Sequence, residues 1–125
     1  EPVGHSYSGK GTVTPDRLIR LAESFPNVRL VFAHWGGGLP FYALMPEVRK
    51  ALGRVWFDSA ASPFLYQRRV FAAVTDLAGP DRVLFGSDFP LLQQKRVLNQ
   101  ARTAGLSSVQ ERNFLGGNAV SLLGL

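Results

Sequence analysis

The stretch Arg29-Leu-Val-Phe-Ala-His34 is a short apolar run that begins at an arginine and ends at a polar residue. Two later stretches repeat this pattern, Arg54-Val-Trp-Phe-Asp58 and Arg82-Val-Leu-Phe-Gly-Ser-Asp88. The apolar centre of each run is continuous rather than alternating, which is typical of strands buried on both faces of a parallel sheet. The three runs therefore predict three parallel strands.

Helical patterns fill the segments before and between these runs. Thr14 precedes Pro15, and apolar residues follow at helical spacing as far as Phe25, which predicts a helix that begins at the proline. Further apolar stripes at helical spacing span residues 41–52, 70–77 and 97–104.

The end of the chain carries signals for shorter helices. Ser108 and Glu111 have the spacing of a capping box, and Asn118 is a residue type that can cap a last helix through Leu123. The proline at position 46 interrupts the 41–52 stripe, which predicts a kink or two short helices there.

The alternation of strand and helix predicts the fold class, because right-handed crossovers place successive strands side by side in a parallel sheet. The repeat length is 25 residues from Arg29 to Arg54 and 28 residues from Arg54 to Arg82. A complete barrel of eight such units needs roughly 250 residues. The sequence therefore predicts an α/β chain, a single domain over 1–125, that forms about half of a TIM-type (β/α)8 barrel. An open doubly wound sheet is the alternative.

Composition excludes several classes of function. The chain contains no cysteine, so any metal must be held by histidine and carboxylate groups. The net charge is +5, but the basic residues are scattered and nucleic-acid recognition motifs are absent. The sequence contains neither an apolar run near the roughly 18 residues of a membrane span nor a signal-peptide pattern. We therefore expect a cytoplasmic protein that acts on a small molecule, with no nucleic acid and no membrane as partner.

Each predicted strand ends in a side chain that can bind a metal or move a proton: His34, Asp58 or Asp88. Ligands collect at the carboxyl ends of strands in parallel α/β folds, so three such endings favour a functional site. Each residue also has a structural interpretation. His34 can be a hydrogen-bonded residue before a glycine turn, and Asp88 can be a turn or helix-capping residue. Asp58 can orient other groups or simply satisfy loop amides. The residues alone leave both interpretations open.

Five ordered motifs resemble the amidohydrolase-related group of the amidohydrolase superfamily. They are Glu1-Pro-Val-Gly-His5, Ala33-His-Trp-Gly-Gly-Gly-Leu-Pro-Phe-Tyr42, Phe57-Asp-Ser-Ala-Ala-Ser-Pro63, Phe85-Gly-Ser-Asp-Phe-Pro90 and Gly116-Gly-Asn-Ala119. This resemblance implies a metal-dependent enzyme on a β/α barrel, of which residues 1–125 would be the C-terminal half with strands six to eight. It also implies a divalent metal ion, which we expect to be zinc.

The resemblance assigns roles to individual residues. Asp88 matches the last-strand aspartate, which binds the metal or activates its water, and His34 matches the sixth-strand histidine, which contacts water or substrate or binds metal. These two are the predicted catalytic residues and metal ligands. Asp58 falls at the seventh strand, and Glu1 and His5 lie in the loop after the fifth strand, so these three are predicted to face the substrate.

The chain also departs from the family pattern. Relatives carry a His-x-His pair on the first strand and a further ligand histidine on the fifth, whereas this sequence contains only His5 and His34. We therefore expect hydrolysis of an amide, ester or lactone, or decarboxylation, in the full-length protein, and an inactive isolated chain. The alternative is a catalytically inactive barrel fragment that acts as a packing or assembly module. Its open sheet predicts a partner, either the missing N-terminal half or a second copy in a homo-oligomer.

Overall fold

Three strands surrounded by short helices make up the computed structural model, which describes residues 3–4 and 6–125. The strands are β1 (Leu30–Phe32), β2 (Val55–Asp58) and β3 (Val83–Leu84). The helices and helical turns are α1 (Pro15–Ser24), η1 (His34–Tyr42), α2 (Pro46–Ala51), η2 (Leu52–Arg54), α3 (Ser62–Leu65), α4 (Arg69–Ala78), α5 (Gln94–Arg102), α6 (Ser108–Arg112), η3 (Asn113–Gly117) and α7 (Asn118–Leu123). Among the described residues, no helix is both long and apolar enough to cross a membrane.

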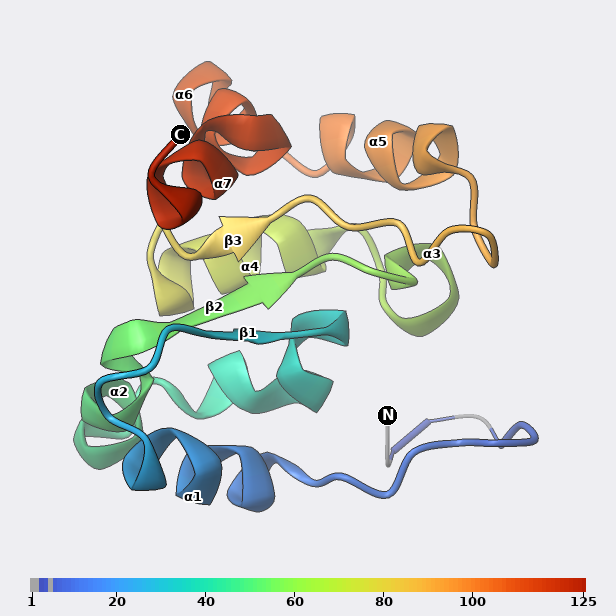
Figure 1. Ribbon diagram of the computed structural model, residues 1–125. Helices are drawn as coiled ribbons and strands as arrows, with labels where there is room; N and C mark the ends of the chain where they lie inside the picture. Colours follow the sequence, from blue (N-terminus) through green and yellow to red (C-terminus); the bar gives the residue numbers. More distant parts are fainter. Residues whose placement is uncertain (1–2, 5) are drawn as a thin grey trace.

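The strands form one parallel sheet in the order β1-β2-β3 (Figure 1). Leu30 lies opposite Val55 in the first pairing, and Phe57 lies opposite Val83 in the second. Helical segments connect each strand to the next, as parallel pairing requires. The predicted class, three parallel strands with intervening helices, is therefore confirmed.

The strands are shorter than the apolar runs that predict them. The first ends at Phe32 rather than at His34, and the third covers only Val83–Leu84 of the run to Asp88. After Leu84 the backbone leaves the ladder, because the amide of Phe85 donates to the carbonyl of Phe114 in η3 instead of to a neighbouring strand. The segments beyond the strand ends are thus free to adopt the conformations that build the site.

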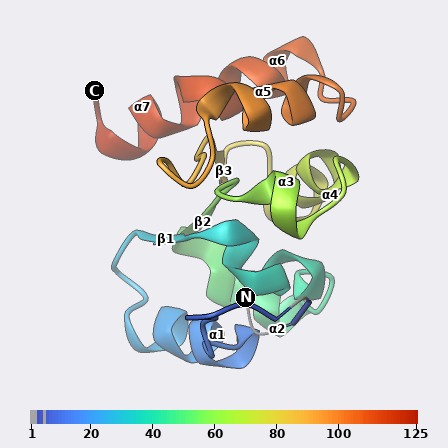
Figure 2. The ribbon, with the colours of Figure 1, turned by 90° about the vertical axis from the view of Figure 1, so that its right-hand side faces the viewer.

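One face of the sheet is covered by helical segments, and the other is largely open. Alternate residues such as Phe32, Phe57 and Val83 are buried on the face that packs on α4 and η1. On the other face Val31 is 46% exposed, and Trp56 is only half-buried. Figure 1 shows the strands unobstructed from this side, with α4 behind them, and Figure 2 shows α3 and α4 together on the far side. In a β/α barrel the open face would be the interior.

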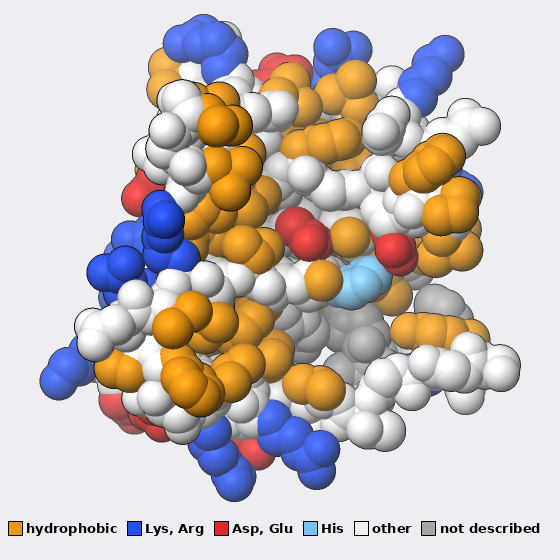
Figure 3. Space-filling model, in the orientation of Figure 1, with side chains coloured by type: hydrophobic (Ala, Val, Ile, Leu, Met, Phe, Trp, Pro, Cys, Tyr) orange, Lys and Arg blue, Asp and Glu red, His pale blue; other side chains and the backbone are white. Residues whose placement is uncertain are grey.

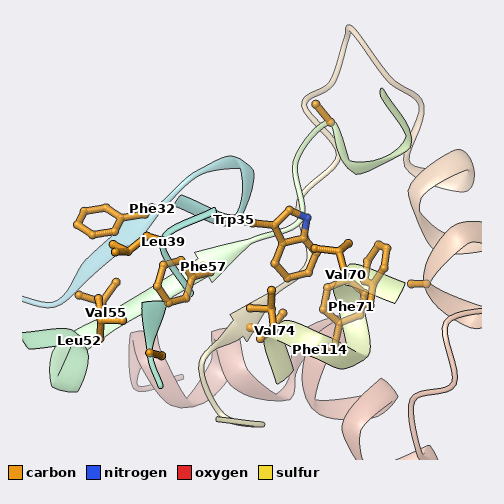
Figure 4. Packing of buried hydrophobic residues seen from close by; sticks show 14 of the residues in the cluster. Phe32, Trp35, Leu39, Leu52, Val55, Phe57, Val70, Phe71, Val74 and Phe114 are labelled. Carbon is orange, nitrogen blue, oxygen red and sulfur yellow. The ribbon is translucent and has the colours of Figure 1, made fainter. Parts of the chain in front are cut away.

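Aromatic rings form a series of edge-to-face contacts in the core between sheet and helices (Figure 4). The Trp35 ring packs edge-on against Phe71 of α4, with centroids 5.2 Å apart, and Phe71 packs in the same way against Phe114 at 5.5 Å. Such edge-to-face pairs add to the stability that comes from buried area alone. The core therefore fixes the residue that directly follows His34, and with it the start of the site.

Candidate functional site

His34 and Asp88 come together at the carboxyl end of the sheet. The Nε2 atom of His34 lies 4.0 Å from Oδ2 of Asp88, and their side chains are 33% and 38% exposed. Both are therefore open to a ligand but partly shielded from water. The predicted catalytic pair lies on one rim.

The backbone at His34 is unusual. His34 and Trp35 have φ values of 54° and 56°, and the three glycines that follow also have positive φ. The left-handed region is costly for residues with a Cβ atom and easy for glycine, which explains why Gly36-Gly37-Gly38 follows at once. Strained non-glycine residues often occur at functional sites, where the surrounding structure holds them.

Gly36 is required for a second reason. A Cβ atom at this position would lie 2.9 Å from Cε1 of Phe57 on β2. The glycine therefore allows the turn to pack directly on the middle strand, and this packing determines where the chain leaves His34.

Asp88 is also left-handed, with a φ of 67°. Its carboxylate is not a helix cap, because α5 begins only at Gln94 and Gln93 occupies the capping position. Its backbone carbonyl accepts from the amide of Leu92, which closes the turn after the strand. The helix-capping interpretation of Asp88 is therefore wrong, and the carboxylate is left to face His34.

Asp58 lies at the same rim but uses one oxygen within the protein. Its Oδ1 accepts hydrogen bonds from the backbone amides of His34 at 3.0 Å and Ala60 at 2.9 Å. Its predicted contact with substrate stays a prediction. What the structure shows is a carboxylate that links the end of β2 to the end of β1.

Two buried serines complete the rim, and no pattern in the sequence singles them out beyond their membership of a motif. The Ser59 hydroxyl donates to the carbonyl of Gly86 at 2.9 Å and accepts from the amide of the same residue at 3.0 Å. The Ser62 hydroxyl accepts from Trp35 Nε1 at 2.7 Å and donates to the carbonyl of Ser59. Neither serine is exposed. Their hydroxyl groups therefore have a structural role and are not placed to act as nucleophiles.

A cavity of about 420 Å³ opens beside His34 and Asp88. His34 and Asp88 form its polar part, and the rest is largely apolar. The remaining lining residues are Tyr7, Ala61, Phe64, Leu65 and Leu91. Figure 3 shows a histidine beside acidic side chains near the middle of the open face, with hydrophobic side chains around them. A concave apolar pocket with a few converging polar groups is the usual form of a small-molecule site.

The donor chemistry fits a divalent metal ion in part. An imidazole and a carboxylate are both ligands of such ions, and the Nδ1 atom of His34 is buried without a hydrogen-bond partner among the described residues. A buried ring nitrogen in this state needs a ligand or a bond from elsewhere. Within residues 3–4 and 6–125, however, no three histidine or acidic side chains form a metal-binding group. Glu1 and His5, the other predicted site residues, lie outside the described residues.

The chain thus has parallel strands, a histidine and an aspartate just beyond their carboxyl ends, and a cavity beside these two residues. Ligands usually bind at this end of the strands in parallel α/β folds. Residues 11–125 match the family model described as amidohydrolase. The chain therefore belongs to the amidohydrolase family, and the predicted membership is confirmed.

Known relatives agree on the fold and are much longer. A 2-amino-3-carboxymuconate-6-semialdehyde decarboxylase of Dictyostelium discoideum is 27% identical, over 82% of this chain and 33% of its own. A dihydroxybenzoic acid decarboxylase of Polaromonas sp. JS666, with bound manganese and the inhibitor 2-nitroresorcinol, superposes with a TM-score of 0.74 at 16% identity, over 89% of this chain and 40% of its own. A Burkholderia multivorans amidohydrolase with bound zinc has a TM-score of 0.67 at 18% identity, over 89% and 49%.

These superpositions establish the fold as part of a TIM-type barrel. The chain spans about a third of the curated relative and 40% to 49% of the two solved structures. The position of the chain within the barrel, as strands six to eight, stays a prediction.

Proposed function

We propose that the chain supplies the proton-handling part of the active site in a divalent-metal-dependent decarboxylase or hydrolase, with Asp88 and His34 as its catalytic residues. The observation that carries this proposal is the 4.0 Å approach of His34 Nε2 to Asp88 Oδ2 at the mouth of an apolar cavity. Two residues from separate strand ends, both in left-handed conformations, face one another there. Membership of the amidohydrolase family supports the same reading.

Asp88 and His34 would also hold the metal, together with ligands from outside the described residues. When bound, a divalent ion acts as a Lewis acid that polarises an oxygen of the substrate and makes water more acidic. Zinc is our proposed identity, with manganese as the alternative, since the solved relatives contain one or the other.

The two side chains can move a proton between a substrate and the rim. In hydrolysis the Asp88 carboxylate would take a proton from the attacking water, and the proton would then pass to the leaving group. In decarboxylation the bond between the substrate carbon and its carboxylate breaks, carbon dioxide leaves, and the pair would deliver a proton to that carbon. His34 Nε2 would hold the reacting oxygen in place in both cases.

The cavity favours a substrate with a flat or compact apolar body. Phe64, Leu65 and Leu91 present apolar surface to the same space that His34 and Asp88 enter. We propose decarboxylation as the first reaction to test, because the curated relative at 27% identity is a decarboxylase. Hydrolysis of an amide, ester or lactone is the second.

A direct experiment uses the full-length protein, stripped of metal by a chelator and reloaded separately with Zn²⁺ and Mn²⁺. Each form is assayed for carbon dioxide release from aromatic and unsaturated carboxylic acids and for cleavage of amides, esters and lactones. We expect turnover in one of the two assays that disappears on chelation and returns with one of the ions. Turnover that is unchanged by chelation would contradict the proposal.

A further inference from the structure

We propose that Asp58 and Ser59, adjacent residues at the end of the middle strand, are positioning residues, and that Asp58 places His34 while Ser59 places Asp88. This inference rests on the proposed function, because it concerns how the same two catalytic groups are held. His34 follows β1 and Asp88 follows β3, and these strands are separated by β2. The chain that follows β2 therefore lies between the two residues that must meet.

Asp58 reaches toward the β1 side. Its Oδ1 accepts from the amide of His34, where the backbone turns left-handed, and from the amide of Ala60. One oxygen thus ties the site histidine to the end of β2. A hydrogen bond from a backbone amide to a charged acceptor is stronger than one between neutral groups, so this contact offsets part of the strain at His34.

On the β3 side, the neighbour of Asp58 is Gly86, which has no side chain. A Cβ atom on Gly86 would lie 3.3 Å from Cγ of Asp58, which is closer than ordinary van der Waals contact. The glycine two positions before Asp88 therefore leaves room for the carboxylate. The space at the rim is shaped around Asp58 from the β3 side.

Ser59 reaches toward the β3 side. Its hydroxyl bonds both the carbonyl and the amide of Gly86, so a side chain replaces the backbone ladder beyond Leu84. The last regular hydrogen bond between β2 and β3 runs from the Ser59 amide to the Leu84 carbonyl at 3.1 Å. The hydroxyl holds the chain next to β2 for two further residues, and Asp88 then turns toward His34.

Two neighbouring residues thus serve opposite sides of the middle strand. The Asp58 carboxylate bonds the chain that follows β1, and the Ser59 hydroxyl bonds the chain that follows β3. Groups that orient a catalytic residue or metal ligand commonly contribute 10- to 100-fold to metal affinity or activity without touching the substrate. We expect the same range for Asp58 and Ser59.

The test compares four variants of the full-length protein: Asp58→Ala, Asp58→Asn, Ser59→Ala and Val74→Ala. Asparagine keeps an oxygen that can accept from His34 but loses the charge. Val74 is fully buried in α4 away from the rim, so Val74→Ala is the control for lost stability alone. The readouts are kcat, KM, Zn²⁺ affinity, and hydrogen exchange of the peptides that contain His34 and Gly86.

We expect Asp58→Ala and Ser59→Ala to lower kcat or Zn²⁺ affinity roughly 10- to 100-fold, with little change in KM. Asp58→Ala should speed exchange at His34, and Ser59→Ala should speed it at Gly86. Asp58→Asn should stay close to wild type, and Val74→Ala should lower the melting temperature without moving kcat. If Asp58→Ala does not fold, the Asp58→Asn and Ser59→Ala variants decide the question.

Two outcomes would overturn the inference. If Asp58→Asn lowers kcat as much as Asp58→Ala does, while hydrogen exchange at His34 keeps its wild-type rate, the charge acts directly on metal or substrate. If Ser59→Ala lowers kcat no more than Val74→Ala does, the serine only contributes stability. Failure of the proposed function is distinguishable, because a protein without metal-dependent turnover would still report the exchange rates at His34 and Gly86.

Discussion

The Nε2 atom of His34 lies 4.0 Å from Oδ2 of Asp88, although the two residues follow strands that do not pair with each other. The strand between them, β2, ends in Asp58, whose side chain turns toward His34. The pair is therefore assembled across the middle strand rather than along a single loop. A site of this kind depends on packing beneath the rim as well as on its own residues.

Replacement of Gly36 by alanine should destabilise the protein by about 1–3 kcal/mol. The new Cβ atom would lie 2.9 Å from Phe57 Cε1, and the φ of 57° is strained for alanine. Denaturant unfolding measures the loss. Gly53→Ala is the control, because a Cβ atom there meets no atom within 4 Å. Equal stability of the two variants would show that the left-handed turn is not packed as described.

Asn118 should be needed for stability because its side-chain amide bonds two carbonyls. Its Nδ2 donates to the carbonyls of Pro80 and Val83 at 2.8 Å each, and the residue is buried. Asn118→Ala leaves both acceptors unsatisfied and should cost about 1–3 kcal/mol. Asn27→Ala, at an exposed turn, should change the unfolding free energy by less than about 0.5 kcal/mol. A neutral Asn118→Ala variant would contradict the bonding shown here.

The start of α1 should make a small contribution to folding stability that is lost in acid. The Thr14 hydroxyl donates to the Asp16 carboxylate and, with help from Arg20, lowers the pKa of Asp16. The pKa of Asp16 is lower in the folded protein than in the unfolded chain. The stabilisation is therefore fully present at pH values above the ordinary aspartate pKa of about 4. It is lost as the pH falls through the folded pKa. Thr14→Val should raise the Asp16 pKa toward its ordinary value, as measured by NMR titration. An unchanged pKa would show that the hydroxyl is not the main cause.

The fold was largely predictable because its signals are local. Continuous apolar runs mark the strands, and the polar residues His34, Asp58 and Asp88 mark their carboxyl ends, which parallel pairing brings to one edge. The helix that begins at Pro15 was also predicted from adjacent residues. The strands end a few residues earlier than predicted. A run of apolar residues does not show where the backbone leaves the hydrogen-bond ladder and enters a left-handed turn.

The details of the site depend on contacts between distant segments, which the sequence does not encode locally. Asn118 fits the pattern of a helix cap, yet Gly117 holds the capping position and Asn118 is the first residue of α7, so the capping prediction is wrong. The side-chain amide of Asn118 bonds carbonyls near β3 instead. The capping box is formed by Ser107 and Gln110 rather than by the predicted Ser108 and Glu111, a shift of one residue within a serine pair. Likewise the hydrogen bond from the His34 amide to Asp58 joins residues 24 positions apart, so no local pattern indicates it.

The most direct test of the proposed catalytic pair is turnover of Asp88→Asn in the full-length protein, measured beside Asp76→Asn at an exposed position on α4. Asparagine keeps the size of the side chain but cannot accept a proton as a carboxylate does. We predict that Asp88→Asn folds normally by circular dichroism and loses at least about 10²-fold in kcat, whereas Asp76→Asn keeps wild-type turnover. A folded Asp88→Asn protein with near-normal turnover would contradict the assignment.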